Sequence, residues 1–92
     1  MKYSKKFNVN TAFKVEKFDN EILLYAVSSS RGVYLNETAY LVWEMCANGH
    51  SIEKIITLLR EAYPLQRESI HKDVVATIES LLDNGVLIAD DD

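Results

Sequence analysis

Residues 33–36, Val-Tyr-Leu-Asn, set the end of an extended segment directly against the start of a helix. Asn36 is a strong helix N-cap, because its side chain can accept a hydrogen bond from a free backbone N–H of the first turn. Glu37 then stands where the helix dipole favours a carboxylate. We therefore expect a strand of only three residues, 33–35, that ends at the cap. So short a strand has little length in which to pair, and it can leave backbone groups open to another chain.

Two longer segments before this strand also have strand patterns. Residues 12–18 alternate apolar and polar side chains, as a half-buried strand does. Residues 22–28 form an apolar run between two turn signals, and the run is too short for a helix. Turn-forming residues at 19–21 join the two segments. With residues 33–35 they predict an antiparallel meander of three strands.

Three helices are expected after the strands. The first follows the cap and ends at Gly49. Its surface is apolar nearly all round, so we expect it at the centre of the domain. The second begins after a Ser51 cap and stops before Pro64. The third spans about residues 67–84 and ends at Gly85, which we expect in a left-handed conformation.

The predicted fold is α+β and winged helix-turn-helix-like, a three-stranded antiparallel sheet followed by three helices. The chain of 92 residues suits a single domain over 1–92, with residues 1–10 and 90–92 loosely ordered. The apolar residues 86–89 are expected to return to the sheet or to the helix ends. Ten apolar residues are expected in the core: Leu24, Leu35, Val42, Trp43, Cys46, Ile55, Ile56, Leu59, Ile78 and Leu82.

Composition and residue types argue against a membrane protein and against an enzyme. No apolar run approaches the roughly 18 residues of a membrane span, so we expect a cytoplasmic protein. Cys46 and His50 have the spacing of metal ligands on a helix, but Gly49 is expected to end the helix between them. Cys46 is expected to be a buried apolar side chain, and the glycines stand singly, without a phosphate-binding loop. We therefore predict no catalysis, no metal and no cofactor.

A winged-helix fold also permits a small transcription regulator that binds DNA. Binding DNA requires clustered basic side chains, whereas the whole chain carries a net charge of −4. The expected recognition helix, the third, is acidic overall, with Arg67 and Lys72 against Glu68, Asp73, Glu79 and Asp83. The fold permits DNA and the charge argues against it, so DNA binding remains the alternative function.

Peptide binding suits the short strand better. An extended peptide can add itself to an unprotected strand edge, with pockets selecting its side chains. Arg31 is the only charged residue that would guard this edge. Apolar residues such as Val33, Ile70 and Val74 would line a groove between the strand and the third helix. The pattern alone equally allows the edge to be covered by the protein's own chain.

An ordered set of residues between 22 and 88 resembles the family of coenzyme PQQ synthesis protein D. The matching residues are Leu35, Asn36, Ala39, Trp43, Gly49, Asp73, Val74, Leu81 and Gly85. The resemblance implies a non-catalytic domain of ribosomal natural-product (RiPP) pathways. Such a domain binds the leader segment of a precursor peptide and presents it to a modifying enzyme or a leader protease. The segment GVYLN, residues 32–36, also resembles leader-binding proteins of lasso-peptide pathways, so the pathway stays open between PQQ, lasso and others.

The resemblance places the leader as an added strand beside the third strand and the third helix. We expect it to run antiparallel, held by main-chain hydrogen bonds. The predicted peptide-binding residues are Arg31, Gly32, Val33, Tyr34, Leu35, Ile70, Asp73, Val74 and Thr77. Val33 and Tyr34 point to opposite sides of a strand, so only one of them can line the groove. Asp73 can pair with a basic leader residue or remain a solvated carboxylate.

Overall fold

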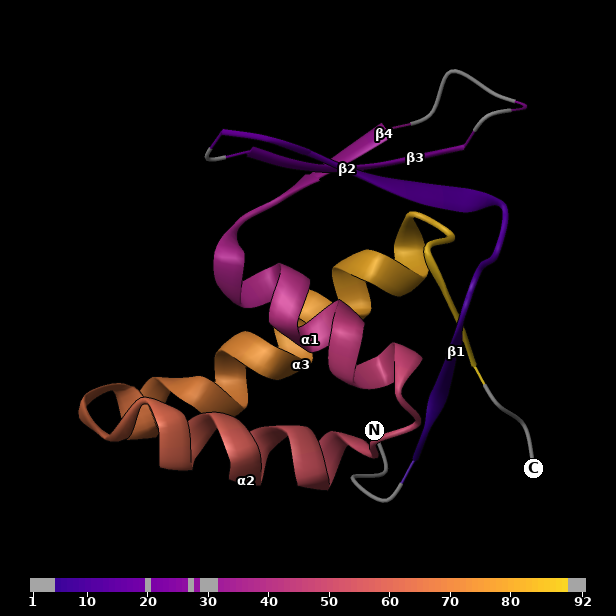
Figure 1. The fold of residues 1–92 in the computed structure, drawn as a ribbon. Coiled ribbons are helices and arrows are strands. Elements are labelled where there is room, and N and C mark those ends of the chain that lie inside the picture. Colours follow the sequence, from indigo (N-terminus) through magenta and orange to yellow (C-terminus); the bar gives the residue numbers. More distant parts are fainter. Residues whose placement is uncertain (1–4, 20, 27, 29–31, 90–92) are drawn as a thin grey trace.

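The computed structural model describes residues 5–19, 21–26, 28 and 32–89. The elements follow in the order β1 (Phe7–Val9), β2 (Phe13–Phe18), β3 (Glu21–Ala26), β4 (Gly32–Leu35), α1 (Glu37–Ala47), α2 (Ile52–Ala62), the 3₁₀ turn η1 (Pro64–Gln66), α3 (Arg67–Asp83) and β5 (Leu87–Ala89) (Figure 1). Strands β2, β3 and β4 form the expected antiparallel meander, and the three expected helices follow it. The α+β, winged helix-turn-helix-like fold is therefore confirmed.

The meander has the order β2-β3-β4, so β3 is central and β4 lies at an edge. Figure 1 shows the three helices on one side of this sheet. The register pairs Val15 with Leu24, and Leu24 with Val33, so these three side chains share the face that meets the helices. Leu24 is fully buried there. Apolar and polar residues thus alternate in β2 because one face of the sheet is packed against the helices.

The first ten residues, which we expected to be loosely ordered, contain a strand. β1 pairs antiparallel with β5 in a separate two-stranded sheet, and Phe7 of β1 is buried. Asn10 fixes the end of β1, because its Nδ2 donates to the Gly85 oxygen at 2.8 Å and its N–H donates to the Val86 oxygen at 2.9 Å. Residues 86–89 therefore do not join the meander, whereas their start does contact a helix end, since the Val86 N–H donates to the Leu81 oxygen of α3 at 2.9 Å. Residues 1–4 and 90–92 lie outside the described residues.

The helix boundaries have the local causes that the sequence predicts. The Oδ1 atom of Asn36 accepts from the Ala39 N–H at 2.8 Å, and Ser51 Oγ accepts from the Lys54 N–H at 3.3 Å. Gly49 and Gly85 have positive φ of 84° and 75°, which confirms the left-handed conformation expected at Gly85. In the described ranges, no helix combines the length and the apolar character that crossing a bilayer requires.

Two of the ten expected core residues lie at the margin of the core. Trp43 and Leu82 are half-buried, whereas the other eight are buried. α1 is apolar on most of its surface, so its sequence has no single stripe that selects the buried face; only Val42 and Cys46 of α1 are buried. At the end of α3, Leu81 takes the buried position and Leu82 lies beside it.

The Trp43 ring stacks on Tyr40 with a centroid separation of 6.0 Å, and its buried Nε1 finds no hydrogen-bond partner in the part of the chain that the structure describes. A buried donor without a partner costs about 1–3 kcal/mol. Replacing Trp43 by Phe removes this donor and keeps a ring, so we expect the free energy of unfolding to change by less than ~1 kcal/mol. Replacing Trp43 by Ala should cost about 3 kcal/mol. Urea unfolding followed by circular dichroism measures both, and equal losses would contradict a cost from the unpartnered donor.

The edge of β4 and the adjoining pockets

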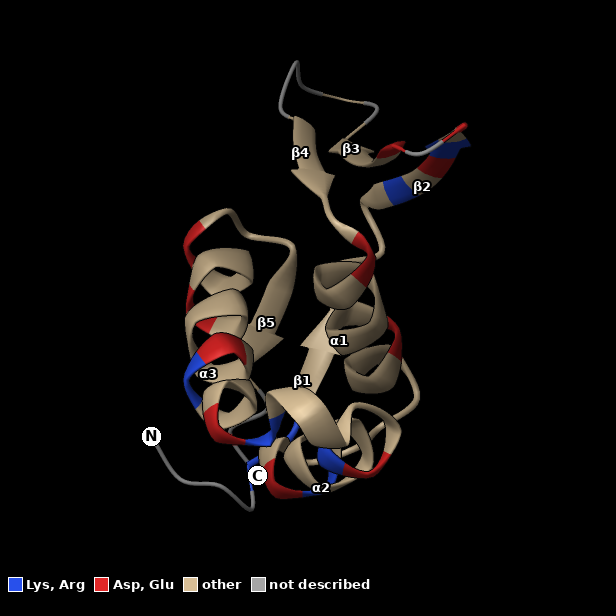
Figure 2. Cartoon of the chain, turned by 90° about the vertical axis from the view of Figure 1, so that its left-hand side faces the viewer, with Lys and Arg blue, Asp and Glu red and all other residues tan. Residues whose placement is uncertain are grey.

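The outer edge of β4 has no strand beside it among the described residues. Figure 2 shows that this edge and α3 lie on the same side of the molecule, while β2 and α1 lie on the other. Among the described residues the sheet therefore presents an unpaired edge on the side of the molecule where α3 lies, and a peptide strand can be added there.

The register decides which side chains of β4 face the helices. Val33 and Leu35 pair with Leu24 and Ile22 on the helix side of the sheet. Tyr34 points to the opposite face and is 68% exposed. Between Val33 and Tyr34, it is thus Val33 that faces the helices.

The tight turn before β3 decides which backbone groups of β4 are free. Two residues link β2 to β3, and the first, Asp19, has a positive φ of 46°. In such a turn the N–H of the residue after the loop, here Glu21, bonds back to the residue before it. Backbone groups of successive residues point to alternate edges, so Glu21, Leu23 and Tyr25 bond to β2, and the residues between them bond to β4.

The paired residues of β4 follow from this alternation. Leu24 bonds to β4, which agrees with the Leu24 oxygen lying 3.8 Å from a Cβ built on Gly32. Its register partner Val33 therefore turns its N–H and C=O toward β3, and Leu35 does the same opposite Ile22. Gly32 and Tyr34 turn theirs to the free edge. An added strand would bond to Gly32 and Tyr34, and not to Val33.

Two pockets adjoin at Asn36, just after β4. The main pocket, of about 370 Å³, lies against α3 and is lined by Asn36, Thr38, Leu59, Tyr63, Gln66, Ile70, Asp73, Val74, Ala76 and Thr77. The edge pocket lies beside the last residues of β4 and is lined by Glu21, Ile22, Tyr34, Leu35 and Asn36. We call the two pockets together the β4 groove. Asn36 can line both while its side chain caps α1.

The β4 groove brings together six of the nine predicted peptide-binding residues. Ile70, Asp73, Val74 and Thr77 line the main pocket, and Tyr34 and Leu35 line the edge pocket. Gly32 and Val33 lie on β4 but line neither pocket, and Arg31 lies outside the described residues. The sequence interpretation missed the contribution of the α2 end, Leu59 and Tyr63. Both belong to the apolar stripe of α2, so the pattern marked them as core and gave no sign of the opening beside them.

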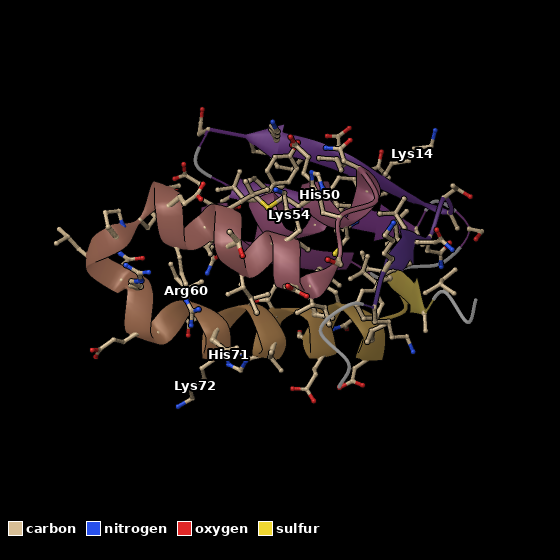
Figure 3. All side chains as sticks on the ribbon, turned by 90° about the horizontal axis from the view of Figure 1, so that it is seen from below. Lys14, His50, Lys54, Arg60, His71 and Lys72 are labelled. Carbon is tan, nitrogen blue, oxygen red and sulfur yellow. The ribbon has the colours of Figure 1, made fainter. Side chains whose placement is uncertain are left out.

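The charged side chains of the β4 groove are carboxylates. Asp73 lines the main pocket and Glu21 lines the edge pocket, and none of the described residues lining either pocket is Lys or Arg. Of the basic residues labelled in Figure 3, Lys72 extends away from the helices and Lys14 points outward from β2. α3 itself carries two basic residues against four acidic ones. This groove attracts cations and repels phosphates.

The described residues that line the groove include no His and no Cys. Cys46 is buried in α1, and desolvation by burial raises the pKa of its thiol from 9.0 to about 12. Within the described ranges, His, Cys, Asp and Glu side chains form no group of three that could hold a metal ion. Cys46 is therefore a buried apolar residue, as expected.

The raised pKa of Cys46 predicts how its reactivity and the stability depend on pH. At about pH 8 the thiol stays protonated in the folded protein, so alkylation by iodoacetamide should be far slower than in urea. Because the unfolded thiol ionises near pH 9, the free energy of unfolding should fall as the pH rises from about 9 toward 12. Mass spectrometry of the alkylated protein and urea titrations at each pH measure the two effects. Equal alkylation rates with and without urea would mean that the thiol is exposed in the folded state.

Solved structures similar to this chain include two peptide complexes. The first is described as "Lasso peptide synthetase B1 complexed with the leader peptide"; it has 26% sequence identity, a TM-score of 0.78, and the match covers 90% of this chain and 98% of that one. The second is described as "TbiB1 in Complex with the TbiA(beta) Leader Peptide"; it has 18% identity, a TM-score of 0.73, and coverage of 87% and 93%. The second likeness, at this low identity, concerns the fold alone. No curated protein matches the sequence.

The sequence also matches a family model. The model is that of coenzyme PQQ synthesis protein D (PqqD), and the match spans residues 21–87. It begins at β3 and ends at β5, so it includes β4, α3 and every residue that lines the two pockets. This chain belongs to the coenzyme PQQ synthesis protein D family.

Proposed function

We propose that this protein binds the leader segment of a ribosomally synthesised precursor peptide and presents it to a modifying enzyme or a leader protease of the same RiPP pathway. The observation that carries the proposal is the free edge of β4 beside the pocketed face of α3. The family and the leader-peptide complex of the lasso peptide synthetase B1 structure support it. The protein acts without catalysis and without a cofactor, in the cytoplasm, where precursor peptides are made.

The leader adds to β4 as an antiparallel strand. Its main chain bonds to the groups that Gly32 and Tyr34 leave free, and these bonds do not depend on the leader sequence. Its side chains then confer selectivity, because alternate ones turn toward the helices and reach the apolar walls formed by Ile70 and Val74. The likeness to the lasso peptide synthetase B1 structure favours a lasso-type pathway, with a leader protease as the partner.

Two experiments test the function. Peptides are selected on the immobilised protein from a displayed library of random sequences, and synthetic peptides are made from the short open reading frames that flank the gene. We expect enriched library peptides, and one flanking sequence, to bind in isothermal titration calorimetry. Absence of peptide binding, with salt-sensitive binding of random duplex DNA, would replace the proposal by the DNA-binding regulator. The acidic surface of α3 gives no support to that outcome.

A further inference from the structure

The charge of the β4 groove points to a chemical feature of its ligand. We infer that the bound peptide carries a Lys or Arg on the N-terminal side of the segment that pairs with β4, and that Asp73 binds this residue. The inference rests on the proposed function and adds a requirement to it. Besides an apolar segment, the leader must have a basic residue that binds Asp73.

Strand polarity decides which part of the peptide meets Asp73. In an antiparallel pair the added strand begins beside the end of its neighbour. The end of β4 is Leu35, and the next residue, Asn36, lines the main pocket together with Asp73. Peptide residues that precede the paired segment therefore enter the main pocket.

Asp73 has no cationic neighbour of its own. It is exposed, and no ion pair links it to any described residue. The residues three and four positions away along α3, where a helical ion pair would form, are Ser69, Ile70, Ala76 and Thr77. Lys72 extends away from the helices (Figure 3). The Arg60 side chain is directed elsewhere, since its Nε donates to the main-chain oxygen of Arg67 at 3.3 Å, and neither Arg60 nor Arg67 lines the main pocket.

The walls around Asp73 favour a long basic side chain over a small cation. Ile70 lies one turn before Asp73 and Val74 directly follows it, and both are buried on α3; Leu59 of α2 and Tyr63 just after α2 line the same pocket. The methylene stem of Lys or Arg can pack along such apolar walls while its charged end reaches the carboxylate. A bound peptide also excludes water from the pocket, which strengthens the attraction between the two charges.

Selection from the random display library tests the inference without knowledge of the natural leader. On the parent protein we expect enriched peptides to share a Lys or Arg at a fixed distance before their apolar pairing segment. On the Asp73→Asn variant we expect the same apolar segment without the basic residue. Enriched peptides that lack the basic residue on the parent protein would overturn this inference and leave the proposed function intact. A library without any enriched peptide would overturn both.

Affinity measurements on one enriched peptide then assign the contact to Asp73. Asp73→Asn should weaken binding roughly three- to ten-fold, and the loss should shrink at high salt. Asp83→Asn is the matched control, because Asp83 is an exposed carboxylate of the same helix that lines neither pocket. Asp73→Lys should bind a peptide whose basic residue is changed to Glu better than it binds the parent peptide. Equal losses from Asp73→Asn and Asp83→Asn would show a general field effect and overturn the assignment.

Discussion

Replacing Tyr34 by proline is expected to weaken binding of a selected peptide by roughly ten- to a hundred-fold while the protein stays folded. Proline removes the N–H that Tyr34 turns to the free edge, and it leaves a carbonyl of the added strand without its donor. An edge strand tolerates proline where the N–H faces away from the sheet. Calorimetric titration of the peptide measures the loss, and circular dichroism checks the fold.

Two neighbouring substitutions serve as controls for this prediction. Tyr34→Ala removes the same side chain and keeps the N–H, so the difference between it and Tyr34→Pro reports the main-chain bond. Val33→Pro removes an N–H that bonds to β3, so it should lower the stability of the sheet itself. If Tyr34→Pro binds the peptide as tightly as Tyr34→Ala does, strand addition at this edge is the wrong mechanism.

Of the substitutions proposed, Leu24→Ala is expected to lower the free energy of unfolding the most. Leu24 is fully buried on the central strand of the meander, where the sheet meets the helices. Truncating such a side chain costs about 2–5 kcal/mol, a large share of the roughly 5–15 kcal/mol that holds a small domain folded. For a chain of this size, we expect the melting temperature to fall by roughly 10–40 °C. Thermal unfolding followed by circular dichroism measures it.

Leu65→Ala is the matched control, because the same atoms are removed from a leucine that is 100% exposed in the turn between α2 and α3. Its melting temperature should stay within a few degrees of the parent value, since an exposed substitution changes stability by about 0.5 kcal/mol or less. Similar losses from Leu24→Ala and Leu65→Ala would mean that the meander is not packed on the helices as described.

The fold was predictable where local chemistry decides the structure. Alternation in β2 and the side-chain caps at Asn36 and Ser51 depend on neighbouring residues, and the sequence displays them. The pairing of β1 with β5 depends on two three-residue segments at opposite ends of the described chain. Neither segment is long enough to show a repeating pattern of apolar and polar residues, so no local pattern predicts their contact.

The groove was predictable in part for a similar reason. The spacing of Ile70, Val74 and Thr77 places them along one side of a helix, and they do line one pocket. The choice between Val33 and Tyr34 depends on the register with β3, which the sequence leaves open. The free backbone groups of Gly32 and Tyr34 follow only from combining that register with the two-residue turn at Asp19.

The pairing of β1 with β5 also has a consequence for the order in which the protein folds. The chain leaves the ribosome N-terminus first, so β1 emerges long before the strand that completes its sheet. Joining segments so far apart carries a large loop-closure entropy, which makes this pairing a late step. Until the two strands pair, the Phe7 ring cannot take the buried position that it has in the core of the folded protein. The residues that line the β4 groove all lie between Glu21 and Thr77, so none of them belongs to the two strands whose pairing is the late step.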